Sequence, residues 1–126
     1  MTGDTLLLRQ VNPNWVQQGR VSSQIFRPTS KDEDHLSVYD GDMITAEEAW
    51  VHFTETLGYK SSGVLAVSQD ECRGQGLPVM PDPAPFPEHA YIDFTGLGRG
   101  DIEKKAELLR GLAVSRGWQY QTENVW

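Results

Sequence analysis

The chain has 126 residues and a formal net charge of -7 at pH 7. A chain of this length forms one domain, residues 1–126, and buries an ordinary core without disulfides or a structural metal. The negative charge argues against binding to a nucleic-acid backbone. The single cysteine, Cys72, excludes an internal disulfide and fits a reducing compartment. Since neither a signal peptide nor a membrane-length apolar run is evident, we expect a cytoplasmic protein without membrane contact.

The first half of the chain predicts two strands and one helix. Residues 5–10, TLLLRQ, predict a buried strand, and the Asn-Pro step after it predicts a turn. The alternating HLSVY segment predicts a second strand, which ends at a tight turn at Asp40-Gly41. Thr45 and Glu48 have the spacing of a capping box, and Gly58 is a natural helix stop. Between them, apolar residues recur at helical spacing: Ala46, Ala49, Trp50, Phe53 and Leu57.

The second half predicts two strands, a short helical turn and a long helix. The strands are residues 63–67 and 89–94, and Ser68 with Glu71 repeats the capping box. Leu77–Glu88 is rich in proline, which favours a rigid extended connector over a ligand for an aromatic groove. The long helix runs from about Asp101 to Arg116 and ends at Gly117. Its predicted buried stripe consists of Ile102, Ala106, Leu109, Leu112 and Ala113.

The tail after Gly117 is compatible with a last strand through Trp118 and Tyr120. Two interpretations of residues 118–126 stay open: the tail closes the core, or it forms an interface. Strands combined with two good helices predict an α+β domain. We expect a small mixed or antiparallel curved sheet with two main helices packed on it.

A long stretch without clear periodicity precedes the second strand and is the predicted binding surface. Arginine forks and an aromatic ring suit a planar anionic ligand or a protein hot spot. The alternative is that Phe26 anchors a surface loop into the core while the charges stay solvated. Long loops without secondary structure of their own are often functional. The candidate binding residues are Arg20, Gln24, Phe26, Arg27, Asp32, Glu33 and Asp34.

Acidic residues dominate the chain from Asp32 to Glu55, which contains eight of them and no lysine or arginine. This run predicts either a solvated acidic face or a surface for a basic protein partner. Its spacing does not match an EF-hand loop, and no histidine pair supports a transition metal. We therefore expect no metal site, with a metal-dependent hydrolase on the acidic residues as a weaker alternative.

Three glycines, Gly96, Gly98 and Gly100, stand between a predicted strand and the last helix. A glycine-rich turn into a helix N-terminus can bind phosphate through unpaired N–H groups. However, the chain leaves no room for the βαβ unit of a dinucleotide fold. The pattern therefore favours a plain loop capped by Asp101.

The sequence gives little support for a catalytic nucleophile. Neighbouring carboxylates, Asp70 and Glu71, should raise the pKa of the Cys72 thiol and blunt it. No serine lies in a G-x-S-x-G motif, so we expect no catalytic triad. The three histidines, His35, His52 and His89, could serve as bases.

Four segments, LLLRQVNPNW, SSQIFRP, LSVYDGD and PFPEHAYIDF, together resemble a group of small, uncharacterised bacterial proteins. This resemblance implies no activity. The first half is also similar to ADP-ribosyltransferase-like domains, including RES-type toxins. In that family an early strand carries an arginine or histidine, and a later strand with a serine or tyrosine leads into a helix. The resemblance implies an NAD-binding enzyme using Arg9, Ser37 and Tyr39, with Glu88 or Glu123 as its late acidic residue.

The sequence thus leaves two function classes. The leading hypothesis is a non-catalytic recognition or accessory protein that binds another protein, for example in a bacterial defence or toxin–immunity system. It rests on the acidic run, the long loop and the lack of catalytic motifs. The alternative is a small ADP-ribosyltransferase-like enzyme or nucleotide-binding domain. This alternative requires Arg9, Ser37 and Tyr39 to converge in one cleft.

Overall fold

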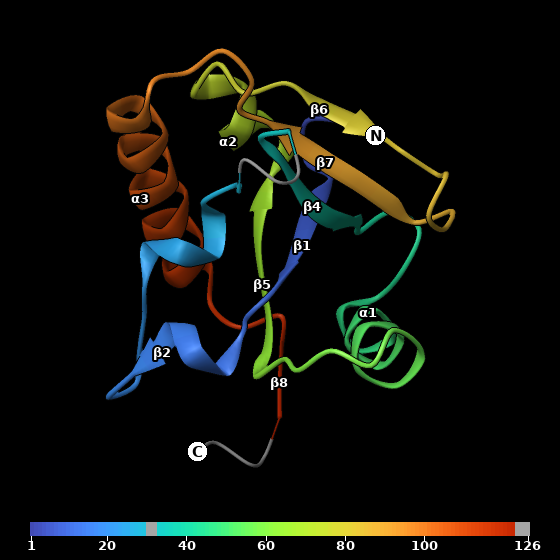
Figure 1. The fold of residues 1–126 in the computed structure, drawn as a ribbon. Helices are drawn as coiled ribbons and strands as arrows, with labels where there is room; N and C mark the ends of the chain where they lie inside the picture. The colour runs from blue at the N-terminus through green and yellow to red at the C-terminus, as the bar shows by residue number, and fades with distance from the viewer. Residues whose placement is uncertain (30–32, 123–126) are drawn as a thin grey trace.

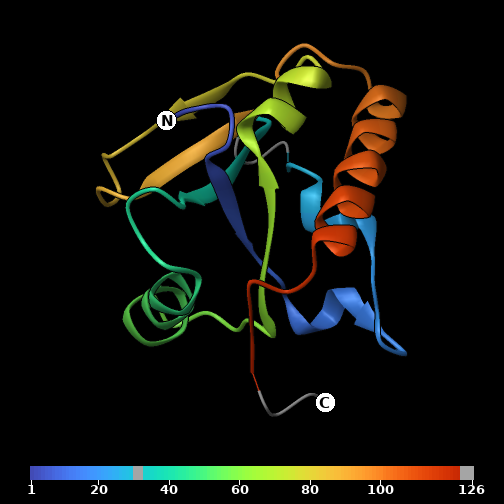
Figure 2. The ribbon, with the colours of Figure 1, turned by 180° about the vertical axis from the view of Figure 1, so that it is seen from behind.

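The computed structural model describes residues 1–29 and 33–122 (Figures 1 and 2). An antiparallel six-stranded sheet has the strand order β6-β7-β4-β1-β5-β8. The strands are β1 (Leu6–Gln10), β4 (His35–Asp40), β5 (Gly63–Ser68), β6 (Val79–Pro81), β7 (His89–Asp93) and β8 (Tyr120–Gln121). A small separate ribbon pairs β2 (Val16–Gln17) with β3 (Arg20–Val21). The predicted α+β class with an antiparallel sheet is confirmed.

Helices cover both faces of this sheet. The long helix α3 (Arg99–Arg116) and the 3₁₀ helix η2 (Ser23–Phe26) pack together on one face. The other face carries α1 (Ala46–Val51), which continues as a π-helical segment, η4 (His52–Thr56). Figure 2 shows α3 and α1 on opposite sides of the strands. Two further short helices are η1 (Pro13–Trp15) and α2 (Gln69–Gly74). Among the described residues, no helix combines the length and apolar sequence that a membrane crossing needs.

The core is divided between the two faces of the sheet, as alternation along β1 illustrates. Leu7 packs in the larger cluster with the buried side chains of α3, whereas Leu8 packs with Tyr39 and Ala49 on the α1 side. This alternation follows from the period of two in a strand. Since both faces are covered, β5 is buried along its whole length.

Both predicted capping boxes are present. Thr45 accepts the backbone N–H of Glu48 at 3.1 Å, and the Glu48 carboxylate accepts the N–H of Thr45. Ser68 and Glu71 repeat this reciprocal arrangement at the start of α2. These short contacts fix where α1 and α2 begin.

The last helix differs from its prediction in two respects. It begins at Arg99 with Gly98 as the N-cap, so Asp101 lies in the first turn and is not the cap. Leu112 is 37% exposed and lies outside the buried stripe, which Ala106, Leu109 and Ala113 form.

The proline-rich segment and the tail both add strands to the sheet. β6 lies inside Leu77–Glu88 and pairs with β7, so this segment is more than a connector. The predicted tail strand is confirmed as β8, which pairs with β5. Trp118 packs against the larger core cluster, so the described part of the tail helps to close the core.

The two central strands, β1 and β4, separate after a short stretch of pairing. Leu7 pairs with Asp40 and Leu8 with Tyr39, and among the described residues the register goes no further. Beyond Leu8, the side chain of Arg9 bridges the gap. Its Nε donates to the Ile25 carbonyl at 2.7 Å, and NH1 donates to the Ser37 carbonyl at 2.8 Å. Arg9 thus provides the Ser37 carbonyl with a hydrogen bond at a point where β1 and β4 no longer pair.

Candidate functional site

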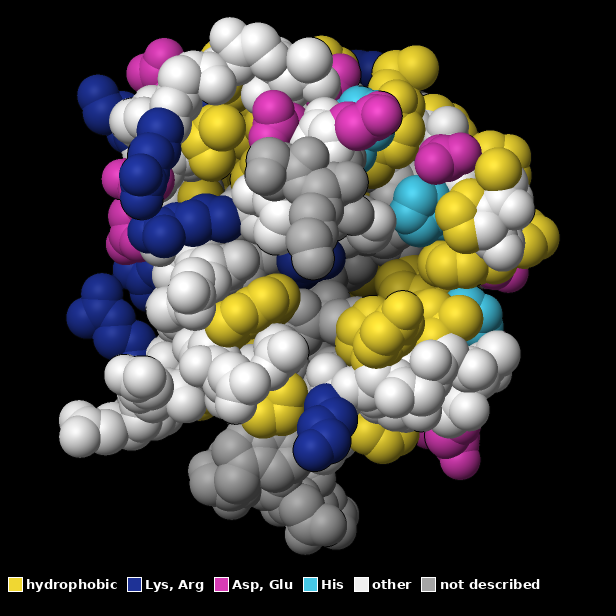
Figure 3. Space-filling model, viewed as in Figure 1, with side chains coloured by type: hydrophobic (Ala, Val, Ile, Leu, Met, Phe, Trp, Pro, Cys, Tyr) yellow, Lys and Arg dark blue, Asp and Glu magenta, His cyan; other side chains and the backbone are white. Residues whose placement is uncertain are grey.

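A pocket of about 270 Å³ lies where β1 and β4 separate, on the sheet face that carries α1. We call it the β1–β4 pocket. Figure 3 shows hydrophobic side chains gathered between α1 and the β4–β7 strands, with histidine side chains beside them. The pocket is lined by Arg9, Gln10, Ser37, Val38, Tyr39, Phe53, Leu57, Tyr59, Pro85, Phe86 and His89.

Aromatic rings form the walls of this pocket. On one side Phe86 stacks on Tyr39 with ring centroids 5.1 Å apart, and it contacts the His89 ring at 5.3 Å. On the other side Phe53 packs against Tyr59 at 5.1 Å. Rings held this way give a stable apolar surface for a planar or branched group.

Gln10 carries an unsatisfied polar group behind these apolar walls. The residue is only 6% exposed, and its side-chain oxygen accepts a hydrogen bond from Ser61 Oγ at 2.7 Å. Within residues 1–29 and 33–122, its amide nitrogen Nε2 has no hydrogen-bond partner. A buried donor without an acceptor costs about 1–3 kcal/mol. Gln10 Nε2 is enclosed by its neighbours, so it lies behind the pocket wall and not in the hollow.

Ser37, His89 and Asp82 form a hydrogen-bonded chain at the rim of the pocket. Ser37 Oγ lies 3.1 Å from His89 Nε2. His89 Nδ1 lies 2.9 Å from the Asp82 carbonyl oxygen and 3.5 Å from the Asp82 carboxylate. These residues come from three adjacent strands: Ser37 from β4, His89 from β7, and Asp82 directly after β6. The order serine, imidazole, carboxylate is that of a nucleophile with its base and orienting group.

The three residues of the enzyme hypothesis, Arg9, Ser37 and Tyr39, all line the β1–β4 pocket. However, the Arg9 side chain lies on the α3 side of the sheet, against Ile25 and the Trp15 ring, whereas Tyr39 packs on the α1 side. The convergence that the enzyme hypothesis requires is therefore incomplete, and two of these polar groups already have partners in the protein. Arg9 bonds the carbonyls of Ile25 and Ser37, and the Tyr39 hydroxyl lies 2.8 Å from His52 Nδ1. Burial, with the nearby negative charge of Glu88, raises the pKa of Tyr39 above its ordinary value. Their catalytic role stays a prediction.

The predicted binding loop divides into parts with different environments. Arg20, Gln24 and Arg27 line one shallow polar depression of about 600 Å³, together with Trp15 and neighbouring polar residues. Phe26 is completely buried and packs in the core, so it cannot contact a partner directly. The alternative interpretation, an aromatic anchor beneath solvated charges, therefore describes Phe26 correctly.

The acidic part of this loop lies elsewhere. Glu33 and Asp34 form a turn with positive φ at both residues, next to the Phe94–Thr95 segment. Asp32 lies outside the described residues. Further along the acidic run, Asp40 is buried and accepts from the Asp42 backbone, while Asp42 accepts from Thr5 Oγ1 at 2.5 Å. Asp40 and Asp42 thus stabilise the turn that follows β4.

No cluster of metal-ligating side chains occurs within the described part of the chain. The glycines Gly96, Gly98 and Gly100 offer no tight cradle, since a Cβ added at any of them would meet nothing within 4 Å. Phosphate binding at this turn stays a prediction. Cys72 is completely buried, and burial is the main reason that its pKa rises to about 12, with Glu71 contributing. The Cys72 thiol is therefore a weak nucleophile, as predicted, although burial raises its pKa more than the neighbouring carboxylate does.

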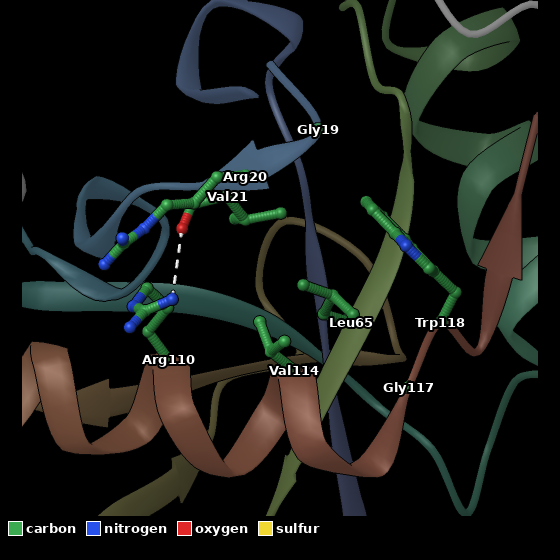
Figure 4. Close-up of a pocket in the computed structure, with 8 residues that line it drawn as sticks. All are labelled: Gly19, Arg20, Val21, Leu65, Arg110, Val114, Gly117 and Trp118. Atoms are coloured by element: carbon green, nitrogen blue, oxygen red, sulfur yellow. Dashed lines mark hydrogen bonds between the residues drawn. The ribbon is translucent and has the colours of Figure 1, made fainter. Parts of the chain in front are cut away.

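Another hollow, of about 220 Å³, lies between the β2–β3 ribbon and the end of α3 (Figure 4). Leu65, Val21 and Val114 contribute its apolar lining, and Trp118 closes one side. Two arginines, Arg20 and Arg110, line it, and Arg110 donates to the Val21 carbonyl at 3.4 Å and forms an ion pair with Glu107. This hollow is smaller than the β1–β4 pocket and has fewer aromatic rings in its walls.

Comparison with known proteins gives no independent indication of function. The chain matches no known protein family, no curated protein and no solved structure. The argument for function therefore depends on the residues of the pocket.

Sequence patterns named Ser37 as a candidate catalytic residue and His89 as a candidate base, but they did not predict that the two side chains meet. Ser37 and His89 are separated by 52 positions, and only strand pairing brings them together. Asp82 and Phe86 lie in the proline-rich segment, which offered no sign of a site.

Proposed function

We propose that this protein is a small-ligand-binding domain whose site is the β1–β4 pocket. The single observation that carries the proposal is the β1–β4 pocket itself, a hollow walled by aromatic rings with Ser37 and His89 at its rim. Sites for small molecules combine apolar walls with a few placed polar groups in this way.

The pocket indicates the chemistry of its ligand. Its walls suit a compact ring or branched acyl group, and the Ser37 hydroxyl at its rim can donate to a carbonyl oxygen on that group. Ligand pockets usually measure about 300–1,000 Å³. At about 270 Å³, this pocket holds one ring-sized group. If the ligand is NAD, as the ADP-ribosyltransferase resemblance implies, the nicotinamide ring is the part that fits beside Arg9, Ser37 and Tyr39.

Two probes test this proposal: benzamide and nicotinamide, titrated into ¹⁵N-labelled protein. We expect both to shift amide signals of residues that line the pocket, because both present a carbonyl oxygen on a flat ring. Phe53→Ala should weaken binding by removing one ring wall. Tyr91→Ala is the matched control, since Tyr91 stacks on His35 and does not line the pocket.

Shifts outside the pocket only, or equal loss of binding in both variants, would reject this site. Binding of nicotinamide without benzamide would favour the NAD alternative, because the two probes differ only at the ring nitrogen. NAD turnover would then be the next assay.

A second candidate function is recognition of a protein partner through the polar depression. Its supporting observation is that Arg20, Gln24 and Arg27 lie together there. A hydrogen bond from Arg110, followed by the charges of Arg110, Arg20 and Arg27, lowers the pKa of nearby Glu107. The depression is therefore locally positive in an acidic protein and suits an acidic partner.

Native mass spectrometry of the protein recovered from its own host tests this second candidate. We expect a stoichiometric protein complex that the double variant Arg20→Glu/Arg27→Glu loses. Reversal of Asp32, Glu33 and Asp34 to lysine is the matched control for the acidic side of the loop. If only this triple variant loses the partner, the acidic surface is the interface and the polar depression is not.

A further inference from the structure

We propose that Ser37 and His89 form an esterase site, which hydrolyses carboxylic esters whose compact acyl group occupies the β1–β4 pocket. This inference rests on the proposed function, because the pocket that binds the carbonyl group also positions it for attack. It adds a reaction and a substrate class to a binding site. Neither follows from the spacing of residues in the sequence.

The hydrogen bonds of His89 determine its tautomer. A carbonyl oxygen can only accept, so the contact of 2.9 Å to the Asp82 carbonyl requires a proton on Nδ1. In the neutral ring Nε2 then carries the lone pair. Ser37 Oγ, 3.1 Å away, consequently donates its proton to Nε2. This is the tautomer that a serine nucleophile needs in its general base.

Ser37 and His89 differ in their exposure to solvent. The His89 side chain is 11% exposed and is held between the Phe86 ring and the Asp82 segment. Ser37 is exposed, although it lines the same pocket. A substrate can therefore place its acyl group in the pocket while its alcohol portion extends into solvent at Ser37.

The reaction proceeds in two balanced steps. Ser37 Oγ attacks the ester carbonyl carbon as its proton passes to His89 Nε2, and the C–O bond to the alcohol then breaks. The alcohol leaves with the proton from Nε2, and the acyl group remains on Ser37. Water next attacks the acyl carbon, giving one proton to Nε2, and the acid leaves as Oγ takes that proton back. The sum is ester plus water to acid plus alcohol.

The Asp82 carboxylate supports the positive charge that forms on His89. It lies 3.5 Å from Nδ1, where it stabilises the imidazolium and acts as a positioning residue.

The first experiment uses two probes on the full chain. Hydrolysis of p-nitrophenyl butyrate reports turnover, and intact mass after diisopropyl fluorophosphate treatment reports the nucleophile. We expect ester hydrolysis and a single adduct that peptide mapping places on Ser37. Ser37→Ala should lose both, whereas Ser115→Ala should retain both, because Ser115 is exposed on α3 at the opposite face.

Further variants separate catalysis from structure. His89→Asn keeps a nitrogen donor for the Asp82 carbonyl but lacks Nε2, and we expect kcat/KM to fall about 100-fold or more. Asp82→Asn keeps the carbonyl and removes the charge. It should lower kcat while KM changes little, because the carboxylate acts on the imidazolium that forms during the reaction.

The outcomes distinguish the inference from the proposed function. If benzamide binds in the pocket but the wild type gives neither hydrolysis nor a Ser37 adduct, the esterase inference is wrong and the binding site stands. Equal hydrolysis by wild type and Ser37→Ala would overturn it as well, since surface imidazoles would then be responsible. A Ser37 adduct without benzamide binding would instead contradict the ligand chemistry proposed for the pocket.

Discussion

Phe26 and Gln24 lie two positions apart in η2 and face opposite environments. Phe26 is completely buried against the core, whereas Gln24 is exposed in the polar depression. The mixture of apolar and polar residues in this stretch left both possibilities open for Phe26. Because Phe26 is buried, it anchors η2 to the core, while polar neighbours such as Gln24 remain accessible to a ligand.

This contrast predicts different effects of alanine at the two positions. Phe26→Ala should lower the free energy of unfolding by about 3–5 kcal/mol, because it leaves a cavity in the core. Gln24→Ala should change it by no more than about 0.5 kcal/mol. Urea unfolding of both variants checks this. A Phe26→Ala protein as stable as the wild type would mean that the ring is not packed in solution.

At the scale of elements, local signals predicted most of the helices. The two capping boxes and the apolar spacing around Ala49 depend on neighbours three or four residues away, so the sequence carries them directly. The π-helical end of α1 and the edge strand inside the proline-rich segment depend on distant packing. The contact between Ser37 and His89 also depends on distant packing, so the sequence did not predict it.

Two glycines in different elements provide a matched test of element packing. Gly63 in β5 has a φ of +154°, and a Cβ there would collide with the Tyr120 carbonyl of β8. Gly111 lies within α3, and a Cβ there would meet nothing within 4 Å. Gly63→Ala should cost about 1–3 kcal/mol of unfolding free energy by displacing β8. Gly111→Ala should add about 0.5–1 kcal/mol through helix propensity.

Thermal and urea unfolding of the two variants measure these effects with opposite expected signs. Amide exchange in β8 adds a specific readout, since Gly63→Ala should speed exchange in that strand. Destabilisation by Gly111→Ala would show that α3 is packed more tightly around residue 111 than the structure indicates.

At the scale of the whole molecule, the buried thiol of Cys72 makes stability depend on alkaline pH. Its pKa is raised from 9.0 to about 12 in the folded protein, chiefly by burial. Between these values the unfolded chain loses the thiol proton while the folded chain keeps it. The free energy of unfolding should therefore be unaffected below about pH 9 and then fall by about 1.4 kcal/mol per pH unit.

Urea unfolding at a series of pH values from 7 to about 11 measures this dependence. Cys72→Ala should be less stable than the wild type at pH 7, because it leaves a small cavity. It should also lose stability less steeply above pH 9. Parallel curves for the two proteins would show that other groups, such as the buried Tyr39, cause the alkaline loss.

The place of β1 in the sheet has a consequence for how the chain folds during synthesis. β1 is first in the sequence but central in the sheet, between β4 and β5 (Figure 1). Its β4 partner is complete at Asp40, whereas its β5 partner is complete only at Ser68. At a synthesis rate of about 5–20 residues per second, one edge of β1 has no partner strand for a few seconds. Its apolar residues are exposed during that interval, which makes the nascent chain a substrate for chaperones before the sheet closes.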